Sequence, residues 1–268
     1  MLKTRLLTAF VAGPLLLASL FLLNTAGIAV LFGVFTAVAA FEWSLLAGLK
    51  VSGSVAFALA VVILGWASLW LSLSLVLIVA SAWWLWALVE VFFFRDQTGP
   101  LWRYRAVRLL CGVPVLIPLW RGCVVLKAQD PGHPWLLGWV LVIVWTADSL
   151  AYFTGRAYGR HKLAPQVSPG KTLEGAAGGL AGAALVGAVG MVLLGFGVRG
   201  VLAGTLLGVV IAAFSVVGDL LESKAKRLAG VKDSGHWLPG HGGVLDRIDA
   251  LTAAVPLFLV GIRWLGVR

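Results

Sequence analysis

The chain has 268 residues, of which 60% are hydrophobic and 12% are charged, and its formal net charge is +10. With a mean hydropathy of +0.99, it has too little polar surface to cover a soluble globule of this size. We therefore expect an integral membrane protein. Its apolar runs extend over about 20 residues without the alternation of a barrel strand, so helices are the expected spanning elements.

Nine apolar runs follow one another, and we expect each to form a spanning helix. Their approximate limits are 6–23, 27–48, 54–71, 73–94, 106–126, 135–155, 174–195, 199–221 and 250–266. The division within 54–94 is the least defined, because that stretch is almost continuously apolar. We expect the first run to be a retained helix, because it is longer than the core of a signal peptide and no clear cleavage site follows it.

The predicted fold is therefore an all-α polytopic membrane protein that forms a single domain, 1–268. About five helices fall in 1–134, and the C-terminal helices in 135–268 carry the polar residues discussed below. Two cysteines, Cys111 and Cys123, lie in or beside the fifth run without a metal-binding spacing, so we expect them to be packed as small apolar side chains.

The distribution of cations predicts the topology. If the amino terminus and the loops after even-numbered helices share one side, that side holds sixteen of the 21 Lys and Arg residues. By the positive-inside rule this side is cytoplasmic, with the amino terminus inside, as expected for a multi-pass protein of a bacterial-type cytoplasmic membrane. The net positive charge then comes from basic residues spread over the cytoplasmic loops, as is usual in membrane proteins. We therefore expect no nucleic-acid partner.

Six acidic residues fall at the predicted cytoplasmic ends of helices: Glu42, Glu90, Asp148, Asp219, Asp246 and Asp249. A carboxylate at membrane depth is costly unless it is paired, hydrated or metal-bound, so each is a candidate functional residue. For Glu42 and Glu90 a simple pairing with a nearby Arg, or a place at the wet interface, explains the sequence equally well.

The segment from Gly218 to Asp249 is the most polar part of the chain. If the eighth helix extends to about Leu228, the residues Asp219, Glu222, Ser223, Lys226 and Arg227 lie on one helix face. A loop with five glycines follows, in which positive φ angles and a close approach of main chain to a ligand are permitted. Two carboxylates, Asp246 and Asp249, then open the last helix, where the helix dipole alone would also favour them.

Carboxylates without cysteine are typical ligands of Mg²⁺, which takes one or two of them and leaves its other positions to water and phosphates. Asp219 and Asp246 are the candidate pair of ligands. The cations Lys226, Arg227, Lys232 and Arg247 would then neutralise phosphate charge. For His241, contact with a phosphate and hydrogen bonding within the turn remain equally acceptable, whereas we expect His236 to be structural.

A second polar segment precedes the seventh helix and reads SPGKTLEG from Ser168 to Gly175. Its Gly-Lys-Thr resembles the end of a P-loop, but Pro165 stands where the first glycine should be and no strand is expected before it, so that interpretation fails. We expect instead that Ser168 caps the seventh helix with Pro169 at its first position. Lys171 and Thr172 would reach a phosphate near that helix terminus.

The run from Ser223 to Asp249 resembles the signature of the phosphatidate cytidylyltransferases, also called CDP-diacylglycerol synthases. The matching positions are Ser223, Lys226-Arg227, Lys232-Asp233, His241-Gly242-Gly243 and Asp246-Arg247-Ile248-Asp249. SPGKTLEG is similar to a second segment of that family. One departure is Ala225, where the family usually has a larger aliphatic residue; it affects packing and not chemistry.

The resemblance implies an enzyme that converts CTP and phosphatidic acid to CDP-diacylglycerol and pyrophosphate with Mg²⁺. Asp219 and Asp246 would hold the metal, and Asp249 a second cation or a metal-bound water. Lys226, Arg227 and Lys171 would clamp phosphates, with a hydrogen bond from Ser223. The partners are CTP, phosphatidic acid and the bilayer.

Several points stay open at this level. A cytidylyltransferase acting on another lipid, such as an isoprenoid ether phosphate, would need the same headgroup chemistry. A carrier for anionic solutes is the alternative from another class. The sequence does not define the oligomeric state, a homodimer included, nor the group that reads the cytosine base, for which Trp237 is a weak candidate.

Overall fold

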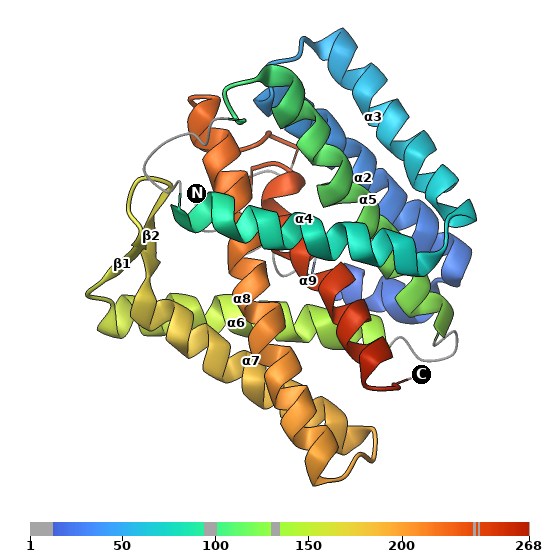
Figure 1. Cartoon of the computed structure of the whole chain (residues 1–268), viewed down its shortest axis with the longest axis vertical. Helices are drawn as coiled ribbons and strands as arrows, with labels where there is room; N and C mark the ends of the chain where they lie inside the picture. The colour runs from blue at the N-terminus through green and yellow to red at the C-terminus, as the bar shows by residue number, and fades with distance from the viewer. Residues whose placement is uncertain (1–12, 94–100, 130–134, 238–239, 241, 268) are drawn as a thin grey trace.

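The computed structural model describes residues 13–93, 101–129, 135–237, 240 and 242–267, which form helices and one short hairpin (Figure 1). An apolar helix at Gly13–Leu22 precedes the labelled elements. These are α2 (Thr25–Leu46), α3 (Val51–Ala67), the 3₁₀ turn η1 (Ser68–Trp70), α4 (Leu73–Phe93), α5 (Arg105–Gln129), α6 (Trp135–Tyr158), β1 (Lys162–Ala164), β2 (Ser168–Thr172), α7 (Leu173–Leu193), α8 (Val198–Leu228) and α9 (Leu245–Trp264).

Within the described residues, seven helices are long and apolar enough to cross a membrane, from α2 to α8. This confirms a multi-pass, predominantly helical membrane protein. The break expected within 54–94 is present between η1 and α4. Helix α9 has 20 residues but includes Asp246, Arg247, Asp249 and Arg263, so it is more polar than the other seven. Part of the first expected span, 6–12, lies outside the described residues.

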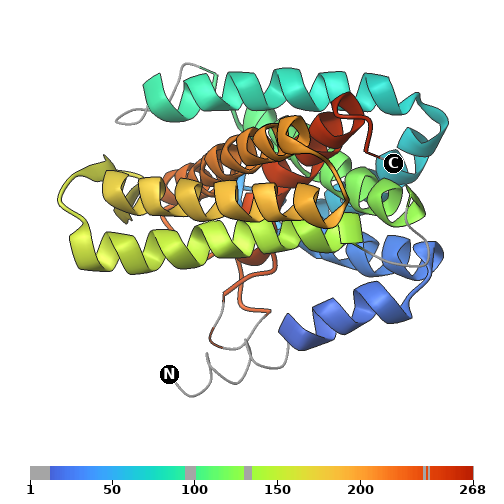
Figure 2. The same cartoon turned by 90° about the horizontal axis from the view of Figure 1, so that it is seen from below.

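The helices pack in two groups around α9. One group contains α2, α3 and α5, and the other contains α6, α7 and α8, while α4 crosses α8 and α9 (Figures 1 and 2). Glycine allows α7 and α8 to approach closely, because a side chain at Gly187 would overlap the main-chain carbonyl of Gly204. The central place of α9 puts its first turn where the two groups meet. Both cysteines are buried and free, as expected.

The expected cap of the seventh helix is wrong, although the helix begins close to the expected limit. Ser168 and Pro169 do not cap it; they belong to strand β2, which pairs antiparallel with β1. The hairpin satisfies the main chain of this segment, and the amide of Leu173 donates to the carbonyl of His161 at 2.9 Å. The true cap is Thr172, whose hydroxyl accepts a hydrogen bond from the amide of Gly175 at 3.1 Å.

Candidate active site

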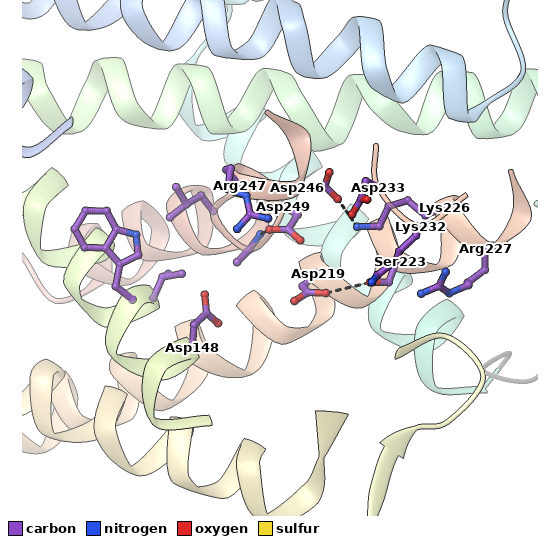
Figure 3. Close-up of a pocket in the computed structure, with 14 residues that line it drawn as sticks. Asp148, Asp219, Ser223, Lys226, Arg227, Lys232, Asp233, Asp246, Arg247 and Asp249 are labelled. Carbon is purple, nitrogen blue, oxygen red and sulfur yellow. Dashed lines mark hydrogen bonds and ion pairs between the residues drawn. The ribbon is translucent and has the colours of Figure 1, made fainter. Parts of the chain in front are cut away.

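A pocket of about 500 Å³ lies between α6, α8, α9 and the loop that joins α8 to α9 (Figure 3). One part of its wall is apolar and consists of Val144, Trp145, Ala250 and Leu251. The rest is densely charged and contains Asp148, Asp219, Ser223, Lys226, Arg227, Lys232, Asp233, Asp246, Arg247 and Asp249. The structure therefore brings most of the predicted site residues to one cavity, although α6 and α9 are separated by about 100 positions in sequence.

Three carboxylates from three helices face the same space: Asp148 of α6, Asp219 of α8 and Asp249 of α9 (Figure 3). Asp219 accepts a hydrogen bond from the hydroxyl of Ser223 at 3.2 Å and forms an ion pair with the Nζ of Lys171 at 2.7 Å. Lys171 extends from the end of β2, so the hairpin supplies a cation to this wall. The sequence placed Asp148 near the cytoplasmic end of a helix but did not assign it to this site.

Asp246 is held by four donors at the start of α9. Its Oδ2 accepts hydrogen bonds from the amide and hydroxyl of Ser234, each at 2.9 Å, and from the amide of Gly243 at 2.8 Å. Its Oδ1 lies 2.5 Å from the Nζ of Lys226, and the same ammonium group pairs with Glu222 one turn earlier on α8. Lys226 thus joins α8 to α9 through Asp246, while its pair with Glu222 lies within α8.

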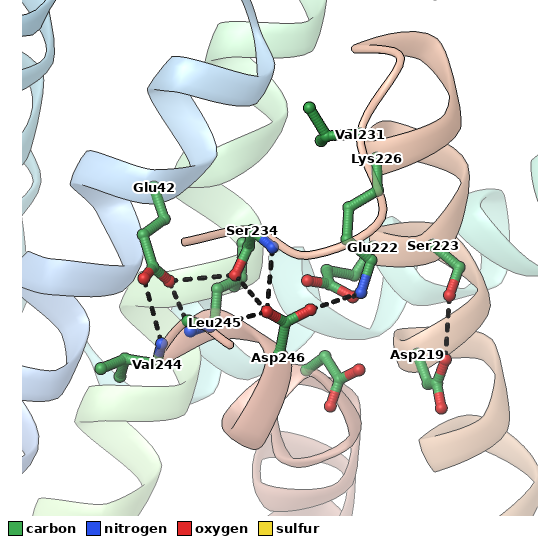
Figure 4. A network of polar contacts seen from close by, with 12 residues as sticks. Glu42, Asp219, Glu222, Ser223, Lys226, Val231, Ser234, Val244, Leu245 and Asp246 are labelled. Atoms are coloured by element: carbon green, nitrogen blue, oxygen red, sulfur yellow. Dashed lines mark hydrogen bonds and ion pairs between the residues drawn. The ribbon is translucent and has the colours of Figure 1, made fainter. Parts of the chain in front are cut away.

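Behind Asp246 lies Glu42 of α2, which is fully buried. Its oxygens accept hydrogen bonds from the amides of Val244 and Leu245 at 3.1 and 2.7 Å and from the hydroxyl of Ser234 at 3.1 Å (Figure 4). The pairing with a nearby Arg that we had considered for Glu42 does not occur among the described residues. A side chain at Gly235 or Gly243 would overlap the Glu42 carboxylate, so this contact requires glycine at both loop positions.

Glu90, in contrast, does pair with a cation. Its Oε1 lies 2.7 Å from the Nζ of Lys224 on α8, with both side chains buried, and the ammonium group also lies 6.0 Å from the ring centroid of Trp102. Among the described residues, the ion-pair partner of Glu90 is a Lys, whereas an Arg was considered from the sequence. Neither residue lines the pocket, so this pair ties α4 to α8 outside the site.

The other predicted phosphate contacts occupy distinct places. Lys232 and Arg247 line the pocket, as does Arg227, which also donates to the carbonyls of Val167 and Val231 at 3.2 Å each. Thr172 is buried and engaged in capping α7. His241 lies outside the described residues. Trp237 is exposed and is not part of the pocket wall.

The donor chemistry of the pocket suits Mg²⁺. The described residues contain no group of three or more His, Cys, Asp or Glu side chains arranged to hold a metal ion, but Mg²⁺ needs only one or two protein carboxylates when water and phosphates supply the rest. In each of these two candidate ligands, Asp219 and Asp246, Oδ1 has one recorded donor among the described residues: Ser223 donates to Asp219, and Lys226 donates to Asp246. A carboxylate oxygen has two acceptor sites, so both side chains retain capacity for a ligand.

Fold and pocket together define a multi-pass membrane protein with a charged pocket suited to polyanions. A family model described as the cytidylyltransferase family matches residues 3–265. The chain is 46% identical over 261 residues to a phosphatidate cytidylyltransferase of Pseudomonas aeruginosa, with 96% of each chain covered. It is 39% identical over 285 residues to one of Haemophilus influenzae, covering 96% of this chain and 97% of the relative. The protein belongs to the cytidylyltransferase family and is a nucleotidyltransferase, which excludes the carrier considered above.

Proposed function

We propose that this protein transfers the cytidylyl group of CTP to phosphatidic acid and releases CDP-diacylglycerol and pyrophosphate. The observation that carries the proposal is the pocket itself, in which carboxylates and cations from three helices and a loop surround one cavity, and Lys171 of the hairpin pairs with one of these carboxylates. Relatives that match almost the full length of the chain are named phosphatidate cytidylyltransferases, which supports this choice of substrates.

In the proposed reaction, an oxygen of the lipid phosphate attacks the α-phosphorus of CTP. A new phosphorus–oxygen bond forms, the bond from the α-phosphorus to the bridging oxygen of the β-phosphate breaks, and pyrophosphate leaves with that electron pair. The attacking oxygen is already anionic near neutral pH, so no activated side chain is needed. In keeping with this, the described pocket wall contains no Cys or His, and its one hydroxyl, Ser223, already donates to Asp219.

The main task of the protein is then to bring two polyanions together and stabilise the charge of the transition state. Mg²⁺, when bound, would neutralise phosphate oxygens and favour their in-line arrangement. We assign Asp219, Asp246 and Asp249 to hold it. Lys226, Arg227 and Lys171 would contact phosphate oxygens, and Ser223, Lys171, Thr172, Lys232, His241 and Arg247 are assigned to binding the substrate phosphates.

The ion pairs of the site support this assignment. Lys171 pairs with Asp219, and Lys226 pairs with Asp246, so two of the proposed phosphate contacts are each paired with a proposed metal ligand. In the absence of substrate these opposite charges stabilise one another. A nucleotide with its cation offers both members of each pair a new partner, a phosphate for the Lys and a metal for the Asp. These two ion pairs can therefore be exchanged for contacts with the substrate and its metal.

The apolar part of the wall fits the second substrate. Val144 and Trp145 of α6 and Leu251 of α9 lie deeper along their helices than Asp148 and Asp246. If the charged end of the pocket faces the cytoplasm, as the distribution of cations predicts, CTP enters there and the glycerol and acyl part of the lipid adjoins the apolar wall. The same chemistry would accept another lipid phosphate.

The test is an assay of purified protein in mixed micelles. We expect pyrophosphate release that requires CTP, phosphatidic acid and Mg²⁺ together, with CDP-diacylglycerol as the lipid product. Release without any lipid phosphate, or equal use of ATP, would contradict the proposal. A panel of acceptors that includes an isoprenoid ether phosphate at matched surface concentration determines which lipid is preferred.

A further inference from the structure

Three consecutive main-chain amides, from just before α9 to its first residue, donate to carboxylates. The amide of Gly243 donates to Asp246, and those of Val244 and Leu245 donate to the two oxygens of Glu42. The residue at the N-cap, Val244, has no side chain that can accept these hydrogen bonds. Helix α9 is therefore capped by a residue of α2 that lies about 200 positions earlier in the chain. A carboxylate in this place also interacts favourably with the helix dipole.

Ser234 connects the two carboxylates. Its hydroxyl lies 3.1 Å from an oxygen of Glu42 and 2.9 Å from Oδ2 of Asp246, while its amide donates to the same Oδ2. All of these groups are buried or nearly so. Because a hydroxyl has a single proton, it donates to one of the two carboxylates at a time. Glu42, Ser234 and Asp246 thus form one continuous network (Figure 4).

The base of this network is rigid. Trp43, the neighbour of Glu42, is buried and donates from its indole nitrogen to the carbonyl of Arg108 at 2.9 Å, which fixes α2 against α5. Within the described residues, the recorded partners of Glu42 are main-chain amides and a hydroxyl, and none is a cation. The hydrogen bonds that stabilise its negative charge therefore come from 234–245, the segment that leads into Asp246.

We infer that Glu42 is a positioning residue for the reaction, which acts through Ser234 and the first turn of α9 to hold Asp246 in its working orientation. The inference rests on the proposed function, because it assigns to Asp246 a role in holding the metal and substrate. Hydrogen-bonding partners behind a metal-binding carboxylate fix its direction, and their loss typically reduces activity or metal affinity by about 10–100-fold. Glu42 touches no substrate, since it does not line the pocket.

The central variant is Glu42→Gln. Its side chain keeps one acceptor oxygen, so one of the two amides, Val244 or Leu245, meets an NH₂ group instead of an oxygen. We expect kcat to fall by roughly 10–100-fold, with a smaller change in KM for CTP, because the loss falls on alignment and not on the pocket itself. In hydrogen exchange, a peptide covering 243–250 should exchange faster than in the wild type. Glu42→Asp, which keeps the charge but is one methylene shorter, should recover part of kcat.

The matched control is Ser44→Ala on the same helix. Ser44 is also fully buried and donates only within α2, to the carbonyl of Phe41. This variant should keep both kcat and the exchange of 243–250 at the wild-type level. If Ser44→Ala lowers kcat as much as Glu42→Gln does, then the loss of any buried polar group of α2 lowers kcat, and the inference is overturned.

A second variant keeps the test decisive if Glu42→Gln does not fold. Ser234→Ala removes the bridging hydroxyl but leaves the amide contacts of Glu42, and we expect a smaller fall in kcat at an unchanged thermal midpoint. Because both side chains act on Asp246 through one network, the double variant should lose little more than Glu42→Gln alone. Wild-type kcat in folded Ser234→Ala, or multiplicative losses in the double variant, would overturn the inference.

The failure of the proposed function would look different. If the wild type forms no CDP-lipid, the proposed reaction is wrong, while accelerated exchange of 243–250 in Glu42→Gln would still show that Glu42 caps α9. If the wild type is active and Glu42→Gln equals it in kcat and in exchange, the reaction stands and the positioning role falls.

Discussion

The two ends of the helix assembly use charged side chains in different ways. At the pocket end, cations pair with carboxylates: Lys171 with Asp219, and Lys226 with Asp246. Helix α5 runs from one end of the assembly to the other. It begins at Arg105, close to the Glu42 network, and its last residue, Gln129, lies at the end opposite the pocket. There Lys127 donates to the carbonyl of Leu20 at 2.8 Å.

At that far end the partners of the cations are main-chain carbonyls at the ends of helices. Lys127 is fully buried against the last turn of the helix Gly13–Leu22, and Arg121 donates to the carbonyl of Leu71, which follows η1. Cations at such positions satisfy carbonyls that lack a partner within the helix. In the described residues neither cation forms an ion pair.

The difference indicates which charges are available for chemistry. If a cation that caps a helix moves away, the carbonyl loses its hydrogen-bond donor within the membrane, which is costly. The role of such a cation is therefore to stabilise the fold. A carboxylate and a cation that face one cavity can each take a new partner from a bound polyanion and its metal. Variants at the two ends should therefore separate turnover from stability.

The largest effect is expected for Asp219→Asn. The amide cannot provide a charged metal ligand and no longer pairs with Lys171, so we expect kcat to fall by about 10³-fold, equivalent to several kcal/mol of transition-state stabilisation. Asp219 makes fewer contacts with the loop than Asp246 does, which makes it the cleaner test of metal binding. The measurement is conversion of labelled CTP across a Mg²⁺ titration, with the thermal midpoint as control for folding. Wild-type conversion would remove Asp219 from the metal site.

A smaller effect is expected for Lys171→Met. This change removes one proposed phosphate contact but leaves Lys226 and Arg227 in place, so kcat should fall by about 10²-fold, as for the loss of one preorganised donor. Lys171→Arg retains the charge and is the matched control, which should recover much of the activity. Wild-type kcat in Lys171→Met would show that Lys171 makes no phosphate contact needed for turnover.

Much of this arrangement could be predicted from the sequence, because the relevant signals are local. The length of the apolar runs predicted the spans from α2 to α8, and helical spacing predicted a polar face on α8. That face is present: Asp219 bonds with Ser223, and Glu222 pairs with Lys226, each one turn apart. The break between η1 and α4 was also predicted, although its position within a continuous apolar run was the least defined.

The features that were missed depend on contacts distant in sequence. Nothing near Glu42 indicates that its partners are the amides of Val244 and Leu245, because those amides become available only when α9 packs against α2. Ser168 was misassigned for a similar reason. Ser-Pro before a helical run is a normal helix start, and only the pairing of β2 with β1 shows that this segment is extended.

The smallest effect on turnover is expected for Lys127→Met, at the far end. Loss of its hydrogen bond leaves the carbonyl of Leu20 buried without this donor, which should lower the free energy of unfolding by about 1–3 kcal/mol. The effect should appear in unfolding by a denaturing detergent, whereas kcat and KM for CTP should remain at the wild-type level, because the site lies at the other end of α5. A fall in kcat without a fall in stability would show that the two ends are coupled, and the division of charge between structure and chemistry drawn above would be wrong.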